Sequence, residues 1–144
     1  GTDGSPENIC KKFIENSKTL ILGTNSFWEG IDLADGILKA IVFPRLPFSV
    51  PTDPVYKKRS DEYEKPFLEY AIPQAILRIR QGFGRLIRTK NDRGIVVILD
   101  KRIISKGYGK LFLKSLPPVS QKTCELLEIG KEVGKWLPME EISN

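Results

Sequence analysis

Cationic side chains that could bind an anion are concentrated in one short segment of this chain. Residues 78–93 contain six Lys and Arg side chains and a single acid, Asp92, so this segment accounts for the whole net charge of +5. Five of the six are arginines, whose planar and permanently charged guanidinium groups match the oxygens of a phosphate. The segment therefore favours phosphate recognition, and a solvated basic helix face is the alternative interpretation.

A helical spacing places the polar members of this segment on one side. At about 100° per residue, one stripe collects an amide and three guanidinium groups, those of Arg78, Gln81, Arg85 and Arg88. The opposite side is apolar and holds Ile76, Ile79, Phe83, Leu86 and Ile87. The pattern predicts a helix over 74–88 that buries one face and presents a row of cations on the other.

Two glycines interrupt the same predicted helix. Gly82 and Gly84 each cost about 1 kcal/mol relative to alanine in a helix interior, and the like charges of Arg85 and Arg88 repel each other across one turn. Glycine is useful where a ligand or another backbone must approach closely, and a bound anion would relieve the repulsion. Both features favour a helix that faces a ligand over one that faces only solvent.

The elements that would position this helix alternate between strands and helices. Apolar runs predict buried strands at 19–22, 39–43 and 94–100. Helices are predicted at 6–16 with Ser5 as its cap, at 55–63, 74–88 and 108–116, and at 121–133 with Ser120 as its cap. Continuous apolar strands between helices predict a single α/β domain whose parallel sheet is covered on both faces. Three strands are few for a complete domain of this class.

Several classes of protein are excluded by composition. The sequence has no histidine, which excludes histidine-based triads and histidine-ligated metals. Its two cysteines, Cys10 and Cys124, lack a metal-binding spacing, and we expect both to be reduced core thiols among apolar helix positions. No metal site is therefore expected in this chain. No apolar stretch has the length of a membrane span and no signal peptide is recognised at the N-terminus, which favours a cytoplasmic protein without a membrane partner.

Two motifs resemble those of superfamily 2 helicases. Segment 81–88, Gln-Gly-Phe-Gly-Arg-Leu-Ile-Arg, is similar to their motif VI, and segment 23–33, which contains Trp-Glu-Gly-Ile-Asp, is similar to motif V. That form of motif V, with 97–102 after motif VI, resembles the branch that contains DinG and XPD, and the run 46–54 is closer to bacterial DinG. The resemblance covers about residues 5–120.

The resemblance implies that residues 1–144 form the second of two RecA-like motor domains, a parallel sheet flanked by helices. The chain has no P-loop motif, so ATP and Mg²⁺ would be bound mainly by the first RecA-like domain of the same protein. Arg85 and Arg88 would reach the γ-phosphate as arginine fingers, and Gln81 would orient the attacking water or a phosphate oxygen. The chain alone is then expected to be catalytically inactive.

Motif V is expected to contact both the nucleotide and DNA. Gly30 and Asp32 would approach the ATP, Asp32 through a ribose hydroxyl or a water. Thr24 and Ser26 would bind phosphates of single-stranded DNA through hydroxyl and backbone N–H groups. Trp28 could stack on a base.

Three further groups have a functional and a structural interpretation. Loop aromatics could stack on bases, but packing against the sheet is favoured for Phe27 and Phe48, and less strongly for Trp28. Lys57-Lys58-Arg59 could contact the DNA backbone or form a solvated helix face. Asp100 and Arg102 are favoured as a structural pair.

Together these expectations indicate the C-terminal motor domain of a DinG-like ATP-dependent DNA helicase that moves 5′ to 3′ on single-stranded DNA, an activity associated with DNA repair. Compared with the family, the chain lacks the strand and motif IV that precede its first helix. An iron–sulfur cluster or an exonuclease domain elsewhere in the full-length protein stays open. The rival functions are a non-catalytic basic nucleic-acid-binding module and an interaction domain that docks a partner on loop 44–54.

Overall fold

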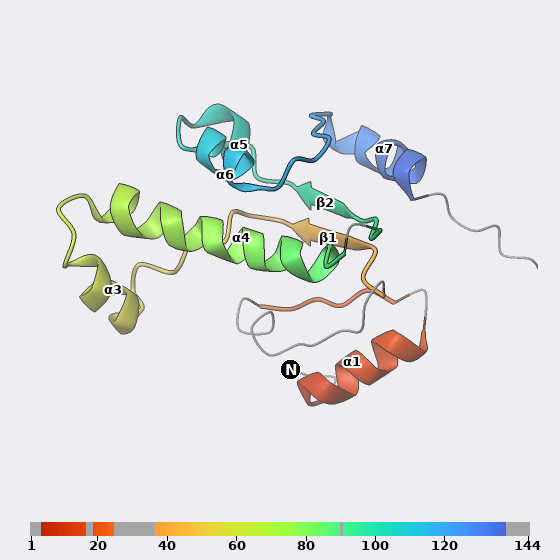
Figure 1. Cartoon of the computed structure of the whole chain (residues 1–144). Helices are drawn as coiled ribbons and strands as arrows, with labels where there is room; N and C mark the ends of the chain where they lie inside the picture. Colours follow the sequence, from red (N-terminus) through yellow and green to blue (C-terminus); the bar gives the residue numbers. More distant parts are fainter. Residues whose placement is uncertain (1–3, 17–18, 25–36, 90, 138–144) are drawn as a thin grey trace, which may run out of the picture.

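The computed structural model describes residues 4–16, 19–24, 37–89 and 91–137 (Figure 1). Helices and strands follow one another in the order α1 (Pro6–Glu15), β1 (Ala40–Phe43), α3 (Pro54–Ser60), the π-helix η1 (Phe67–Ala71), α4 (Ile72–Leu86), β2 (Ile95–Ile98), α5 (Arg102–Ser105), α6 (Gly109–Ser115), the 3-10 helix η2 (Leu126–Glu128) and α7 (Ile129–Trp136). This is an α/β arrangement, as the sequence predicts.

The two strands pair in parallel, with Ala40 opposite Ile95 and Phe43 opposite Ile98. The chain between them contains α4, which runs beside the sheet and contacts β1 (Figure 1). A helical crossover between parallel strands is the usual way to join them. The strands predicted at 39–43 and 94–100 are therefore confirmed, each with slightly narrower bounds.

One apolar core joins β1, α4 and α6. Ile41 and Phe43 of β1 pack with Ile79 and Leu86 of α4 and with Phe112 of α6, all less than 9% exposed. Each large apolar side chain that is fully buried in this way contributes about 1.5–3 kcal/mol to stability. This core fixes the position of α4 and therefore of the polar side chains on its other face.

The expectation that both faces of the sheet are covered is wrong for β1. Ile41 and Phe43 are buried, but Val42 between them is 46% exposed. Successive side chains of a strand point to opposite faces, and α4 and α6 pack on the Ile41 and Phe43 side. In the described part of the chain, the other face of β1 stays open.

The strand predicted at 19–22 is also wrong. This segment has no regular structure, and the side chains of Leu20 and Leu22 are 76% and 87% exposed. A strand is stabilised by hydrogen bonds to a neighbouring strand, and among the described residues this segment pairs with neither β1 nor β2. An apolar run alone does not supply that partner.

Two helices begin at a proline that follows a capping side chain, whereas α4 continues directly from η1 and does not begin near residue 74 as predicted. Ser5 caps α1 and its hydroxyl accepts a hydrogen bond from the Asn8 N–H at 3.4 Å, with Pro6 in the first turn. Asp53 caps α3 in the same way, through the Val55 N–H at 2.8 Å and the Tyr56 N–H at 3.0 Å. The Ser5 cap was predicted from the sequence, whereas the Asp53 cap was not, and α3 is shorter than the helix predicted at 55–63.

The last helix begins later than predicted. Residues 121–125 are not helical, so Ser120 is not its cap, and Glu125 and Glu128 instead form a reciprocal capping box at the start of η2. Cys124 therefore does not lie on a helix, contrary to expectation. Both cysteines are free and only partly buried, so neither is a core thiol.

Candidate functional site

Helix α4 presents Gln81 and Arg85 on the side opposite its buried face. Ile79, Phe83 and Leu86 anchor the helix in the core, while Gln81 is exposed and Arg85 is half-buried. In the part of the chain that the structure describes, neither polar side chain has a hydrogen-bond or ion-pair partner. The predicted division of α4 into an apolar and a polar face is confirmed at these two positions.

The two glycines of α4 have different surroundings. A Cβ on Gly82 would lie 2.9 Å from Cζ of Phe43, which is closer than normal packing allows, whereas a Cβ on Gly84 would meet no atom within 4 Å. Gly82 therefore permits close packing of α4 on β1, and its neighbour is a core ring of the same chain instead of a ligand. Gly84 is exposed on the Gln81 and Arg85 side and leaves that surface accessible.

Arg78 does not join the outward-facing row. It is half-buried, and its Nη1 donates a hydrogen bond to the Pro47 carbonyl oxygen at 2.9 Å. A hydrogen bond from a charged group contributes about 1.5–3 kcal/mol, so Arg78 holds the proline-rich loop against α4. The prediction that three guanidinium groups point in one direction is wrong for this residue.

Arg88 lies beyond α4, because the helix ends at Leu86 and Ile87 is extended (φ −121°, ψ 102°). The backbone N–H groups of Arg88 and Thr89 donate to Oδ2 of Asp92 at 2.8 and 2.7 Å. These two bonds lower the pKa of Asp92, so its carboxylate stays ionised and closes the turn. The position of the exposed Arg88 is therefore set by this turn and not by helical spacing, which corrects the predicted helix end at residue 88.

Most of the motif V prediction cannot be placed. Ser26, Trp28, Gly30 and Asp32 lie outside the described residues. Thr24 is described and exposed. The structure thus brings Gln81 and Arg85 together, and their relation to the predicted DNA-contacting residues stays a prediction.

At the other end of the sheet, Asp100 joins the chain segments that follow β1 and β2. Its Oδ2 accepts the Leu46 N–H at 2.9 Å and the Arg102 Nη2 at 2.6 Å, and its Oδ1 accepts the Arg102 backbone N–H at 3.0 Å and Nε at 2.9 Å. The Arg102 guanidinium is the main reason that the pKa of Asp100 lies well below its ordinary value. The predicted structural pair is confirmed, and it also anchors Leu46.

Phe48 is part of an aromatic cluster. Its ring centroid lies 5.6 Å from that of Phe67 and 5.9 Å from those of Tyr108 and Phe112, and the Arg102 guanidinium carbon lies 5.4 Å from it. Aromatic pairs at these distances contribute about 0.5–1.5 kcal/mol beyond area burial. Phe48 therefore has a structural role, half-buried between neighbouring rings that belong to η1 and the α6 region, whereas packing against the sheet was predicted.

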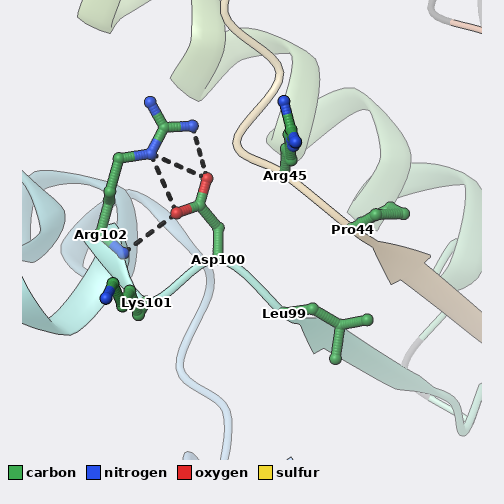
Figure 2. Close-up of a pocket in the computed structure, with 6 residues that line it drawn as sticks. All are labelled: Pro44, Arg45, Leu99, Asp100, Lys101 and Arg102. Carbon is green, nitrogen blue, oxygen red and sulfur yellow. Dashed lines mark hydrogen bonds and ion pairs between the residues drawn. The ribbon is translucent and has the colours of Figure 1, made fainter.

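A pocket lies beside this cluster, at the carboxyl ends of β1 and β2 (Figure 2). It is lined by Pro44, Arg45, Leu99, Asp100, Lys101 and Arg102. Sequence reasoning did not single out Arg45. The available signal was its place two residues after a strand of a parallel sheet, an edge at which ligands commonly bind.

No metal site is found in the described residues, where no three acidic, histidine or cysteine side chains are grouped. Cys10 lies in α1, and partial burial raises the pKa of its thiol, which makes it less reactive. Among the helices described here, none is both long enough and apolar enough to cross a membrane.

The chain is similar in sequence to known helicase domains. The profile of a family described as "Helicase C-terminal domain" matches residues 1–119. The chain is 42% identical over 133 residues to "3'-5' exonuclease DinG" of Bacillus subtilis, 38% identical over 129 residues to "ATP-dependent DNA helicase YoaA" of Haemophilus influenzae, and 39% identical over 118 residues to YoaA of Escherichia coli. The alignments cover 88%, 87% and 79% of this chain but only 14%, 20% and 19% of those relatives.

Proposed function

Because the chain belongs to the helicase C-terminal domain family and is DinG-like in sequence, we propose that it is the second RecA-like domain of an ATP-dependent DNA helicase. The domain would act together with a first RecA-like domain that carries the P-loop, and it would move 5′ to 3′ on single-stranded DNA in the cytoplasm. The chain spans about a seventh to a fifth of the relatives named above.

The end of α4 is the observation that carries this proposal. Gln81 and Arg85 project from a helix whose opposite face is buried in the core, and neither has a partner within the described chain. Arg88 follows in a turn that Asp92 closes. The uncommitted side-chain donors of Gln81 and Arg85 on a rigid helix suit groups that must meet charge on another surface.

In the proposed mechanism these residues act on the terminal phosphate of ATP. Arg85 and Arg88 would place their guanidinium groups against the equatorial oxygens of the γ-phosphoryl group, where negative charge must be stabilised during transfer. Gln81 would orient the attacking water or hold a phosphate oxygen. ATP and Mg²⁺ would be held mainly by the first domain, since this sequence contains no P-loop motif.

Motif V would link the nucleotide to DNA. We assign Gly30 and Asp32 to the nucleotide, and Thr24, Ser26 and Trp28 to single-stranded DNA. The support for this is the order and spacing of the motif in the sequence, together with the exposure of Thr24. We expect no iron–sulfur cluster in this domain, because such a cluster is held by four cysteines and the sequence has two, Cys10 and Cys124, far apart.

The test is Arg88→Ala in a protein that contains both motor domains. We expect kcat for DNA-stimulated ATP hydrolysis to fall by about 10³-fold, with a much smaller change in nucleotide affinity, because a finger acts chiefly in the transition state. The 144-residue chain alone, mixed with ATP and single-stranded DNA, should show no hydrolysis above background. Equal losses of affinity and rate in Arg88→Ala would remove the finger assignment, and clear turnover by the chain alone would contradict the two-domain proposal.

A further inference from the structure

The two strands end in basic segments that lie next to each other. β1 ends at Phe43, two residues before Arg45, and β2 ends at Ile98, three residues before Lys101. Because Phe43 and Ile98 are register partners in a parallel pair, both segments leave the sheet at the same edge. Arg45, Lys101 and Arg102 therefore line one pocket, with Arg45 on the side of Asp100 opposite Arg102 (Figure 2).

The charges of this pocket are unbalanced. It contains three cations and one acid, and the acid is already committed, since the Asp100 carboxylate binds the Arg102 guanidinium and the Leu46 N–H. Arg45 and Lys101 are exposed, and within the described residues neither side chain has a hydrogen-bond or ion-pair partner. Two positive charges thus remain available to an anion.

The same acid also fixes the geometry of the pocket. Asp100 is 9% exposed and holds the residues after β1 to those after β2. Arg102 is in turn held over the Phe48 ring at 5.4 Å. The backbone that carries Arg45 and Lys101 is therefore anchored before any ligand arrives, which reduces the entropy lost on binding.

We propose that Arg45 and Lys101 form a binding site for the phosphodiester backbone of single-stranded DNA at the carboxyl edge of the sheet. This inference rests on the proposed function, and it adds a contact outside motifs V and VI. A DNA strand fits better than a free nucleotide. Small-molecule sites enclose most of their ligand, whereas this pocket is open, and its two available cations come from separate chain segments along one edge, as is suited to tracking a backbone.

The experiment measures binding of a labelled oligothymidylate to the 144-residue chain by fluorescence anisotropy at several salt concentrations. In Arg45→Ala/Lys101→Ala, we expect weaker binding and a log–log salt slope shallower by about 1.4, because each phosphate contact on a single strand contributes about 0.7. Between 50 and 200 mM salt, the affinity of the wild-type chain should then fall about sevenfold more than that of the variant. Lys11→Ala/Lys12→Ala is the matched control, since it removes the same charge from exposed positions of α1, away from this edge (Figure 1).

The outcomes separate this site from the proposed function. The site would be overturned by an unchanged salt slope in Arg45→Ala/Lys101→Ala, or by an equal change in the α1 control. The motor proposal would be unaffected by either result, because Arg88→Ala tests it independently. The absence of salt-dependent binding by the wild-type chain would also overturn it. A parallel titration with ATP should give the same result for wild type and variant, and loss of ATP binding only in the variant would assign the pocket to a nucleotide instead of DNA.

Discussion

Arg85 on α4 and Arg102 at the sheet edge are both half-buried arginines, but their surroundings differ. The Arg102 guanidinium is bonded to the buried Asp100 carboxylate and lies over the Phe48 ring. Arg85 has no hydrogen-bond or ion-pair partner within the described residues. Burial and residue type therefore do not distinguish a structural arginine from one that is available to a ligand, whereas the presence of an acceptor in the same chain does.

The same distinction appears within α4. Arg78 and Arg85 are seven residues apart, close to two helical turns, and so lie on nearly the same side. Arg78 donates to the Pro47 carbonyl oxygen, so the first half of the stripe holds a loop while the second half stays open. A row of like residues in the sequence thus contains two different roles.

The largest expected effect is a difference between these two arginines in a protein that contains both motor domains. Arg85→Ala should lower kcat for ATP hydrolysis by about 10³-fold, because it removes charge stabilisation in the transition state. Arg78→Ala should leave kcat nearly unchanged and lower the free energy of unfolding by about 1.5–3 kcal/mol, because it removes a hydrogen bond from a charged group. Steady-state ATPase assays and urea denaturation measure the two quantities, and equal rate losses would show that the Pro47 bond does not separate the roles.

Local sequence signals predicted much of the fold. The cap at Ser5, the two paired strands and the apolar face of α4 follow from residue type and spacing alone. The segment 19–22 was mispredicted because strand formation depends on a neighbour that sequence periodicity does not supply. The start of α7 was mispredicted because Glu125 and Glu128 cap each other, where a serine was expected.

The candidate site was predictable only in part. The outward position of Gln81 and Arg85 follows from helical periodicity. The role of Arg78 depends on a carbonyl 31 residues away in the sequence, and the position of Arg88 depends on the Asp92 turn. Neither partner is visible in a helical pattern. Arg45 and Lys101 come together only through the strand register, which required the structure.

The second prediction concerns Asp100, the buried carboxylate that binds the Arg102 guanidinium. Asp100→Asn should lower the free energy of unfolding by about 2 kcal/mol, because the amide keeps one acceptor but loses the charge-assisted bonds to Arg102. Glu132→Gln is the control, since Glu132 also pairs with two cations, Lys122 and Lys135, but on the surface of α7. Exposed pairs contribute little, so the control should lose much less stability in urea denaturation. Similar losses would mean that the buried position of Asp100 adds nothing.

The same residue gives a pH dependence with a defined sign. Its bonds to Arg102 and Leu46 lower the pKa of Asp100 in the folded chain below its unfolded value of about 3.9. The resulting stabilisation is therefore complete above about pH 4 and is lost as the pH falls from there toward the folded pKa. The urea midpoint should fall less steeply below about pH 4 in Asp100→Asn than in the wild-type chain. If the urea midpoint fell equally steeply with decreasing pH in the wild-type chain and in Asp100→Asn, the assignment of this effect to Asp100 would be contradicted.

The smallest expected effect compares the two faces of α4 through its glycines. Gly82→Ala should destabilise the chain by about 1 kcal/mol, because the new methyl group would lie 2.9 Å from Phe43 Cζ and overpacking outweighs the gain in helix propensity. Gly84→Ala should stabilise it by about 0.5–1 kcal/mol, because nothing lies within 4 Å of the added Cβ. Urea denaturation of both variants shows whether each free energy of unfolding falls or rises.

In a protein that contains both motor domains, Gly84→Ala should also slow ATP hydrolysis if the first domain approaches this surface, since the methyl group would then stand beside Gln81 and Arg85. A more stable Gly84→Ala variant with full activity would indicate that no partner comes close to this face.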